Sequence, residues 1–152
     1  MAKQRINGDQ LGNTGGAWTS YTPTWTLTSA ASQSITSTGG YIQIGKTVHF
    51  WATGKVNGSS NFSGLSSVIV SLPVAASAGM YGDNFMELNT RFLDSGTAWY
   101  SGKAIIDGAN RAYIMATNTA STYASNVTIT SAIPFSWALN DTFNVNGTYE
   151  AA

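Results

Sequence analysis

The sequence predicts an all-β protein, an antiparallel β-sandwich or jelly roll of about eight or nine short strands preceded by an extended N-terminal arm. Three observations lead to this prediction. Apolar and polar residues alternate along much of the chain, which is the period of a strand with one buried face. Pairs of turn-forming residues separate the alternating segments. No long stretch carries helical periodicity with capping residues.

Residues 1–16 differ from the rest of the chain. They contain two basic residues, Lys3 and Arg5, and only two large aliphatic residues beyond Met1, namely Ile6 and Leu11. A segment so poor in apolar residues cannot bury enough surface to order itself. It is therefore either disordered or ordered against a partner surface, and both alternatives stay open. Residues 17–152 form the predicted β domain.

Nine segments of the β domain have the composition of strands. They are rich in β-branched and aromatic residues and are bounded by Gly, Asn, Asp or Ser. Asp107-Gly108-Ala109-Asn110 separates two of them and predicts a hairpin loop. The expected strands are 18–28, 40–44, 47–56, 68–72, 87–93, 98–106, 111–117, 127–130 and 142–149.

The clearest alternation runs from Thr47 to Val56. It places Val48, Phe50 and Ala52 on an apolar face, and Trp51 on the opposite, polar face. Similar alternation at 98–106 and 111–117 places Trp99 and Tyr113 on polar faces as well. The sequence thus predicts aromatic rings on the outer surface of several strands.

The composition excludes several classes of partner. Only 9% of the residues are charged, against about 25% in an ordinary soluble domain, and seven basic residues balance seven acidic ones. A nucleic-acid-binding protein needs a basic face to neutralise phosphates, so no nucleic-acid partner is expected. The chain has neither an apolar run long enough for a membrane helix nor the apolar segment of a secretory signal. We expect no membrane partner.

One segment matches the string of a phosphate-binding loop. Residues 40–47 read GYIQIGKT, which fits G-x-x-x-x-G-K-[ST]. A working loop of this kind lies between a strand and the start of a helix, where backbone N–H groups surround the phosphate. Here strand-forming residues lie inside the string and follow it. We therefore expect a hairpin turn at Gly45-Lys46 and no nucleotide. The chain has no cysteine for a thiolate metal site, and no loop carries more than one or two carboxylates for calcium, so we expect no cofactor or metal.

Catalytic arrangements are poorly supported. His49 is the only histidine, and it lies inside a predicted strand with no nucleophile-elbow string nearby. A glycosidase needs two carboxylates at a defined separation, but the spacing in the chain pairs no two of those available. We therefore expect no enzymatic activity. The carboxylates considered are Asp83, Glu87, Asp94, Asp107, Asp141 and Glu150.

Trp51, Trp99 and Tyr113 have three interpretations. They could form a second core layer if the predicted faces were inverted. They could anchor a subunit interface, where aromatic residues are enriched and charged residues depleted. They could also form a platform on which sugar rings stack while neighbouring hydroxyl groups bind the sugar hydroxyls. The sequence alone leaves all three open.

Four segments in order carry a resemblance to a known family. They read WTSYTPTW at 18–25, YIQIGKTVHF at 41–50, SLPV at 71–74 and GTYE at 147–150. Together they resemble a domain of virion surface proteins from tailed bacteriophages, often those of actinobacterial hosts, and the resemblance covers about residues 17–150. The segment INGDQL at 6–11 is similar to attachment segments that precede phage fibre domains.

The resemblance implies a non-enzymatic, trimeric structural protein on the virion surface, assembled in the host cytoplasm and released by lysis. Within that class, a short arm and one β domain suit a capsid decoration (cement or head-fibre) protein. The arm residues Lys3, Arg5, Ile6 and Leu11 would then attach it to the major capsid protein. The alternative is a tail-fibre or minor tail module that binds host cell-surface glycans through Trp51, Trp99 and Tyr113.

The low charge leads to one further expectation. Proteins with exposed sheet edges usually protect them with charged residues, especially lysine. A chain with so many strands and so few charges is expected to cover its edges and aromatic surfaces with copies of itself. The sequence therefore predicts an obligate oligomer.

Overall fold

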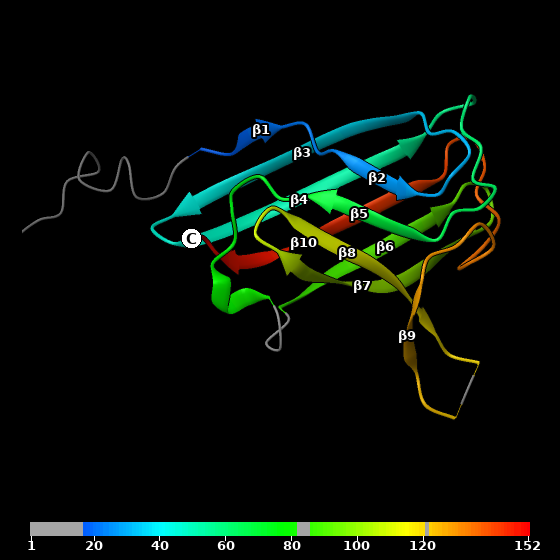
Figure 1. The fold of residues 1–152 in the computed structure, drawn as a ribbon. Coiled ribbons are helices and arrows are strands. Elements are labelled where there is room, and N and C mark those ends of the chain that lie inside the picture. Colours follow the sequence, from blue (N-terminus) through cyan, green and yellow to red (C-terminus); the bar gives the residue numbers. More distant parts are fainter. Residues whose placement is uncertain (1–16, 82–85, 121) are drawn as a thin grey trace, which may run out of the picture.

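The computed structural model describes residues 17–81, 86–120 and 122–152 (Figure 1). Within these ranges the chain forms ten strands and one short 3₁₀ turn, Ala78–Met80. The strands are β1 (Thr19–Tyr21), β2 (Trp25–Thr28), β3 (Ile35–Ile44), β4 (Thr47–Val56), β5 (Ser67–Ser71), β6 (Glu87–Asp94), β7 (Ala98–Gly108), β8 (Arg111–Asn118), β9 (Ser125–Thr128) and β10 (Thr142–Glu150). Among the described residues, no helix has the length and apolar character that crossing a membrane requires.

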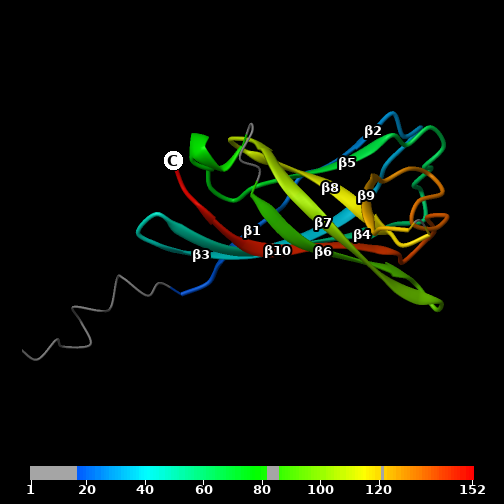
Figure 2. The same ribbon diagram turned by 90° about the horizontal axis from the view of Figure 1, so that it is seen from below.

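All strand pairs belong to one antiparallel sheet with the order β1-β3-β4-β10-β6-β7-β8-β5-β2, and β9 adds to β8. The two ends of this order, β1 and β2, are consecutive in the chain and are joined by only residues 22–24. A connection that short requires the sheet to curl until its ends approach each other. Figure 2 shows the result, a layer around β3, β4, β10 and β6 facing a layer around β8, β5 and β2.

The core fills the space between the two layers. Inward positions along β4, β6 and β8 are almost fully buried, as the pattern of β4 illustrates with Val48, Phe50, Ala52 and Val56. Aromatic rings meet at the centre, where Phe143 of β10 stacks on Trp137 with ring centroids 4.1 Å apart. Burying a side chain of this size contributes about 1.5–3 kcal/mol. The curled sheet is thus held closed by a shared aromatic core.

The structure confirms the all-β antiparallel fold and finds a strand in each of the nine expected segments, with one difference. The expected strand 18–28 is divided into β1 and β2, which lie at opposite ends of the sheet. Pro23, which is buried, separates them. Proline has no N–H to donate to a ladder, so it is unsuited to the interior of a paired strand. This division raises the number of strands to ten.

The predicted faces and the two hairpin turns that flank β4 and β8 are confirmed, but the turn also expected at Gly39-Gly40 is wrong, because β3 begins at Ile35 and both glycines are paired within it. Residues 45 and 46 form the turn between β3 and β4, and the φ of Gly45 is 59°. The string at 40–47 is therefore a hairpin, as expected. Residues 109 and 110 turn the chain between β7 and β8. The arm residues Lys3, Arg5, Ile6 and Leu11 and the carboxylate Asp83 lie outside the described residues.

Candidate functional site

The outer face of the β4-β10-β6-β7 region is rich in polar side chains. The strand register aligns one row across it, in which Trp51 pairs with Asn146, Asn146 with Asn89, and Asn89 with Lys103. Parallel rows on the same face carry His49 beside Thr148 and Thr53 beside Asn144. Asn and Thr supply most of these side chains, so the surface is polar but carries little charge.

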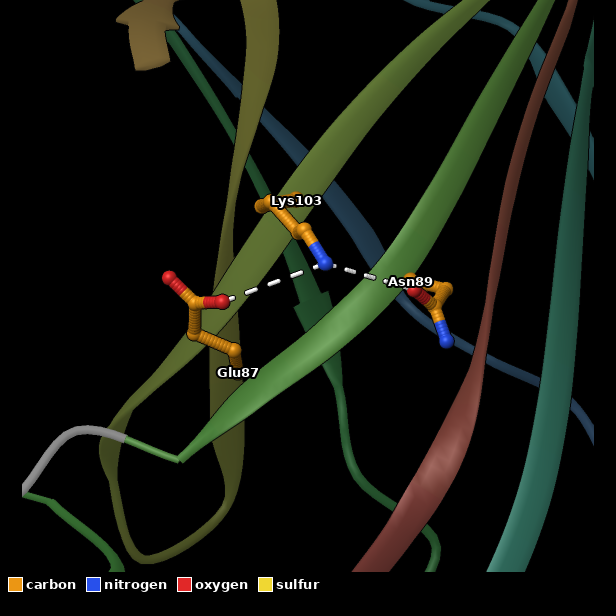
Figure 3. A network of polar contacts seen from close by, with 3 residues as sticks. All are labelled: Glu87, Asn89 and Lys103. Atoms are coloured by element: carbon orange, nitrogen blue, oxygen red, sulfur yellow. Dashed lines mark hydrogen bonds and ion pairs between the residues drawn. The ribbon is translucent and has the colours of Figure 1, made fainter. Parts of the chain in front are cut away.

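Most polar groups of this face bond to one another across strands. His49 Nδ1 lies 2.7 Å from Thr148 Oγ1, and Thr53 donates to Asn144 Oδ1 at 2.9 Å. Figure 3 shows Lys103 of β7 between two residues of β6, with its Nζ 3.9 Å from Glu87 and 3.5 Å from Asn89. Both partners of this ion pair are largely exposed, and such pairs contribute little to stability. The network stabilises side-chain positions on the surface.

Trp51 differs from its neighbours on this face. Its side chain remains 42% exposed, and its indole lies over Gly40 of β3. No aromatic ring or cation in the described part of the chain covers its outer side. Trp51 is thus a flat apolar surface open to solvent.

A hollow of about 420 Å³ adjoins Trp51 at the edge of the sheet. It lies where β1 ends and leaves the first half of β3 without a partner on that side, because β1 pairs only with residues 39–41. Its lining combines Trp51 and Gly39 with five hydroxyl side chains, those of Ser20, Tyr21, Thr22, Ser37 and Thr38. An aromatic ring beside several hydroxyl groups is an arrangement that binds polar ligands with apolar faces.

The hydroxyl group of Tyr21 is the buried member of this lining. It is buried without a hydrogen-bond partner among the described residues. Burial, and to a smaller extent the neighbouring Tyr149, raises the pKa of Tyr21 well above its ordinary value. The phenol therefore stays protonated at physiological pH, and its buried oxygen is out of reach of a ligand in the hollow.

The other two aromatic candidates are engaged elsewhere. Trp99 is 51% exposed, but the guanidinium carbon of Arg91 lies 3.7 Å from its ring centroid. The Tyr113 hydroxyl donates to Thr128 Oγ1 at 3.2 Å. Since Trp51 and Trp99 are exposed, they do not form a second core layer of this chain.

The structure does not bring the three aromatic residues together. Trp51 lies on β4 and Trp99 on β7, three strand positions apart in the sheet. Neighbouring strands are about 4.8 Å apart, which separates the two strands by about 14 Å. Tyr113 lies one strand further, on β8. The three residues therefore do not form one contiguous aromatic surface in one molecule, and of the three only Trp51 lines a hydroxyl-rich hollow.

The candidate acid–base groups are dispersed. His49 contacts Thr148, Asp107 pairs with Arg111 at 3.2 Å, and the buried Asp141 accepts two backbone hydrogen bonds. Over the ranges that the structure describes, no group of three His, Cys, Asp or Glu residues could hold a metal ion. His49, Asp107 and Asp141 therefore each have a local structural partner.

Besides a hollow of about 420 Å³ lined by Lys46, Met86 and Glu150 among others, two further hollows lie on the described part of the molecule. One, of about 370 Å³, lies between Tyr100, Val127 and the cis Ile133-Pro134 segment. The other, of about 290 Å³, adjoins the Trp51 hollow through Ser37 and extends along the seam between β3 and β2. Neither contains an exposed aromatic ring of the kind that Trp51 provides.

Sequence reasoning selected Trp51 but missed the hydroxyl residues around it. Ser20, Thr22, Ser37 and Thr38 are ordinary residues of a Ser/Thr-rich chain, and nothing in their spacing joins them. They meet only because β1 pairs with β3 and then ends at Tyr21.

Comparison with known proteins yields no match for this chain among protein-family models, curated proteins or solved structures. The assignment of the surface therefore depends on its own geometry and chemistry.

Proposed function

We propose that this chain is a non-enzymatic structural protein of a tailed-bacteriophage virion surface. In the proposal it is a capsid decoration protein that assembles as a homotrimer and attaches to the major capsid protein through residues 1–16. The resemblance of the segments at 18–25, 41–50, 71–74 and 147–150 supports this assignment. So does the scarcity of charge, which is typical of surfaces that are covered in an assembly.

The observation that carries the proposal is an exposed apolar surface beside the start of the described chain. Trp18 is 57% exposed and Ile44 is 43% exposed. The register of β1 with β3 pairs Thr19 with Tyr41, which places Trp18 opposite Ile42, two residues from Ile44. Large exposed aromatic residues are the typical anchors of protein interfaces. We therefore assign this surface to attachment or subunit contact together with the arm.

The edges of the sheet give weaker support to an oligomer than the low charge of the chain suggests. The edge strands β1, β2 and β9 contain no charged residue, but they have only three or four residues each. Short edge strands themselves limit unwanted pairing. The proposed trimer is therefore supported mainly by Trp18 and Ile44, and less by the uncharged edges.

A second candidate function has its own observation. The hollow beside Trp51 favours recognition of a glycan by this domain, as a tail-fibre or minor tail receptor module would require. Both candidates are non-enzymatic, so purified protein should not hydrolyse any glycan that it binds.

The test of attachment compares the full chain with residues 17–152. Particles that lack the protein are incubated with each form, and the bound protein is measured after sedimentation. We expect the full chain to bind and the shortened chain to remain unbound but folded, because residues 25–151 build a closed hydrophobic core between the layers of the sheet. The substitution Trp99→Ala is a matched control that should bind normally. If the shortened chain coats particles as the full chain does, attachment through the arm is wrong.

A further inference from the structure

We propose that the hollow beside Trp51 is a binding site for one unit of a neutral saccharide, which stacks on the indole and hydrogen-bonds to the surrounding hydroxyl groups. The inference deepens the second candidate function and gives it a site and a ligand class. It does not depend on attachment through residues 1–16, since the site is built entirely from described residues.

The backbone of β3 supports the exposed indole of Trp51. A Cβ on Gly40 would lie 2.9 Å from Nε1 of Trp51, and a Cβ on Gly39 would collide with Tyr21. Because residue 40 is glycine, the Trp51 ring rests directly on the backbone of β3 while its side chain stays 42% exposed, and the glycine at residue 39 makes room for Tyr21 on the opposite face. Aromatic rings contribute rigid, flat apolar area at little cost in entropy. The C–H face of a pyranose ring is the complementary surface on a sugar.

The hydroxyl groups of the hollow differ from those elsewhere on the outer face in their hydrogen bonding. Elsewhere on the outer face, hydroxyl side chains bond to protein groups, as Thr53 does with Asn144 and Thr148 with His49. Four hydroxyl side chains of the hollow, those of Ser20, Thr22, Ser37 and Thr38, have no partner among the described residues, whereas the hydroxyl group of Tyr21 is buried. Each of the four can donate one hydrogen bond and accept two. A sugar ring carries hydroxyl groups with the same dual character.

The lining of the hollow is uncharged. None of the seven residues that line the hollow is Asp, Glu, Lys, Arg or His. A carboxylate or phosphate on the ligand would find no cation to pair with and would lose part of its hydration. The site therefore favours neutral hexoses and N-acetylhexosamines over uronic acids, sialic acids and sugar phosphates.

The size and openness of the hollow set the expected affinity. Its volume of about 420 Å³ falls within the range of about 300–1,000 Å³ for small-ligand clefts. It is an open hollow at a sheet edge, and the adjoining hollow shares Ser37 with it. A single sugar therefore binds weakly, with a Kd of about 1 mM, and a second unit can extend toward Gln33 along the seam.

The test is a titration of ¹⁵N-labelled full chain with methyl glycosides of glucose, galactose, mannose and N-acetylglucosamine, followed by NMR. We expect at least one of them to shift the backbone signals of residues 20–22 and 37–40 and the indole signal of Trp51. Glucuronic acid should bind at least about tenfold more weakly, a difference of about 1.4 kcal/mol.

Three variants make the test specific. Trp51→Ala should weaken binding at least about tenfold, and Thr38→Val, which removes one hydroxyl while keeping the shape, should weaken it by a few fold. Trp99→Ala is the matched control, since it removes an indole of comparable exposure, 51% against 42%, three strands away and should leave binding unchanged. The spectra themselves report whether each variant is folded.

Several results would overturn the proposal. It is wrong if none of the four glycosides shifts these signals at 50 times the expected Kd of about 1 mM, or if Trp51→Ala binds them as well as the original chain. It is also wrong if Trp51→Ala lowers the oligomer mass and leaves sugar binding intact, which would make Trp51 a subunit contact. All of these measurements use free protein and free sugar, so failure of the particle-binding test leaves them unaffected.

Discussion

Gly40 and Trp51 form a cross-strand pair in which the indole occupies the space of the missing side chain. The two residues are register partners of β3 and β4, and a Cβ built on Gly40 lies 2.9 Å from Nε1 and 3.2 Å from Cε2 of Trp51. Glycine within a strand usually weakens it, and it is expected where another group approaches the backbone closely. Here the approaching group is the ring that borders the proposed sugar site.

The substitution Gly40→Val tests this pair directly. A valine side chain at residue 40 must displace the indole, and overpacking of this kind costs about 1–3 kcal/mol. Because Trp51 is on the surface, the ring can move outward, so we expect a loss of about 1 kcal/mol in urea denaturation and a marked change in the indole NMR signal. Gly45→Ala is not a suitable control because the φ of Gly45 is 59°, whereas Gly79→Ala meets open space and should change neither signal. An unchanged Trp51 indole signal in Gly40→Val would contradict the close contact.

The buried Asp141 stabilises the turn that precedes β10. Its Oδ1 accepts from Ser95 N at 2.9 Å and its Oδ2 accepts from Ala138 N at 2.6 Å. Removing the carboxylate leaves two N–H donors without their charge-assisted bonds, so Asp141→Ala should lower the free energy of unfolding by about 3 kcal/mol. Asp141→Asn keeps one acceptor and should cost about half as much. Equal stability of the two variants in denaturant titrations would show that the two hydrogen bonds are not the cause.

Tyr149 gives the fold a pH dependence in alkaline solution. Its hydroxyl donates to Val74 O at 2.6 Å and accepts from Val74 N at 3.1 Å. Burial raises the pKa of Tyr149 from 10.0 to about 12, although the Val74 backbone bond opposes the shift. A tyrosine whose pKa is higher in the folded state stabilises the fold fully below pH 10, and this stability is lost as the pH rises through 12.

We therefore expect the free energy of unfolding to fall between pH 10 and 12, and to fall less steeply in Tyr149→Phe. Tyr149→Phe should also be less stable at neutral pH, because Val74 loses both hydrogen bonds. Burial raises the pKa of Tyr21 in the same direction, so the variant keeps part of the dependence. Denaturant titrations at a series of pH values provide the measurement, and identical slopes for the two proteins would refute the role of Tyr149.

The proposed trimer can be checked in solution. Light scattering of the purified full chain should give three times the chain mass of 16.0 kDa, and Trp18→Ser should shift the equilibrium toward smaller species because it removes an exposed anchor. Trp99→Ser, which removes an indole of similar exposure far from β1, should leave the mass unchanged. A stable monomer at micromolar concentration would contradict the trimer.

Local features of the fold were predictable from the sequence because they depend on neighbouring residues. The alternation at 47–56 correctly placed Val48 and Phe50 inside and Trp51 outside. The glycine at residue 45 correctly marked a turn. The error at 18–28 has a local cause as well, since the alternation continues across Pro23 while the chain changes its partner strand there.

The candidate site was only partly predictable because it depends on strand order. Trp51, Trp99 and Tyr113 look equivalent in sequence, yet β10 and β6 separate the first two. Arg91 covers Trp99, and its position opposite Ser101 on the neighbouring strand is a matter of register. The hydroxyl groups around Trp51 come from segments that only the β1–β3 pairing joins. Nothing in the spacing of these residues encodes that pairing.

The most direct test of the proposed function is a difference map from cryo-electron microscopy of particles assembled with and without this chain. The proposal predicts additional density on the outer surface of the capsid that fits three copies of the β domain around a symmetry axis. A connection from each copy should pass from the β1 end of the sheet to the major capsid protein. Maps that are identical over the capsid surface would contradict the decoration role. Additional density found only at the tail tip would instead support the alternative, a receptor-binding module of the tail.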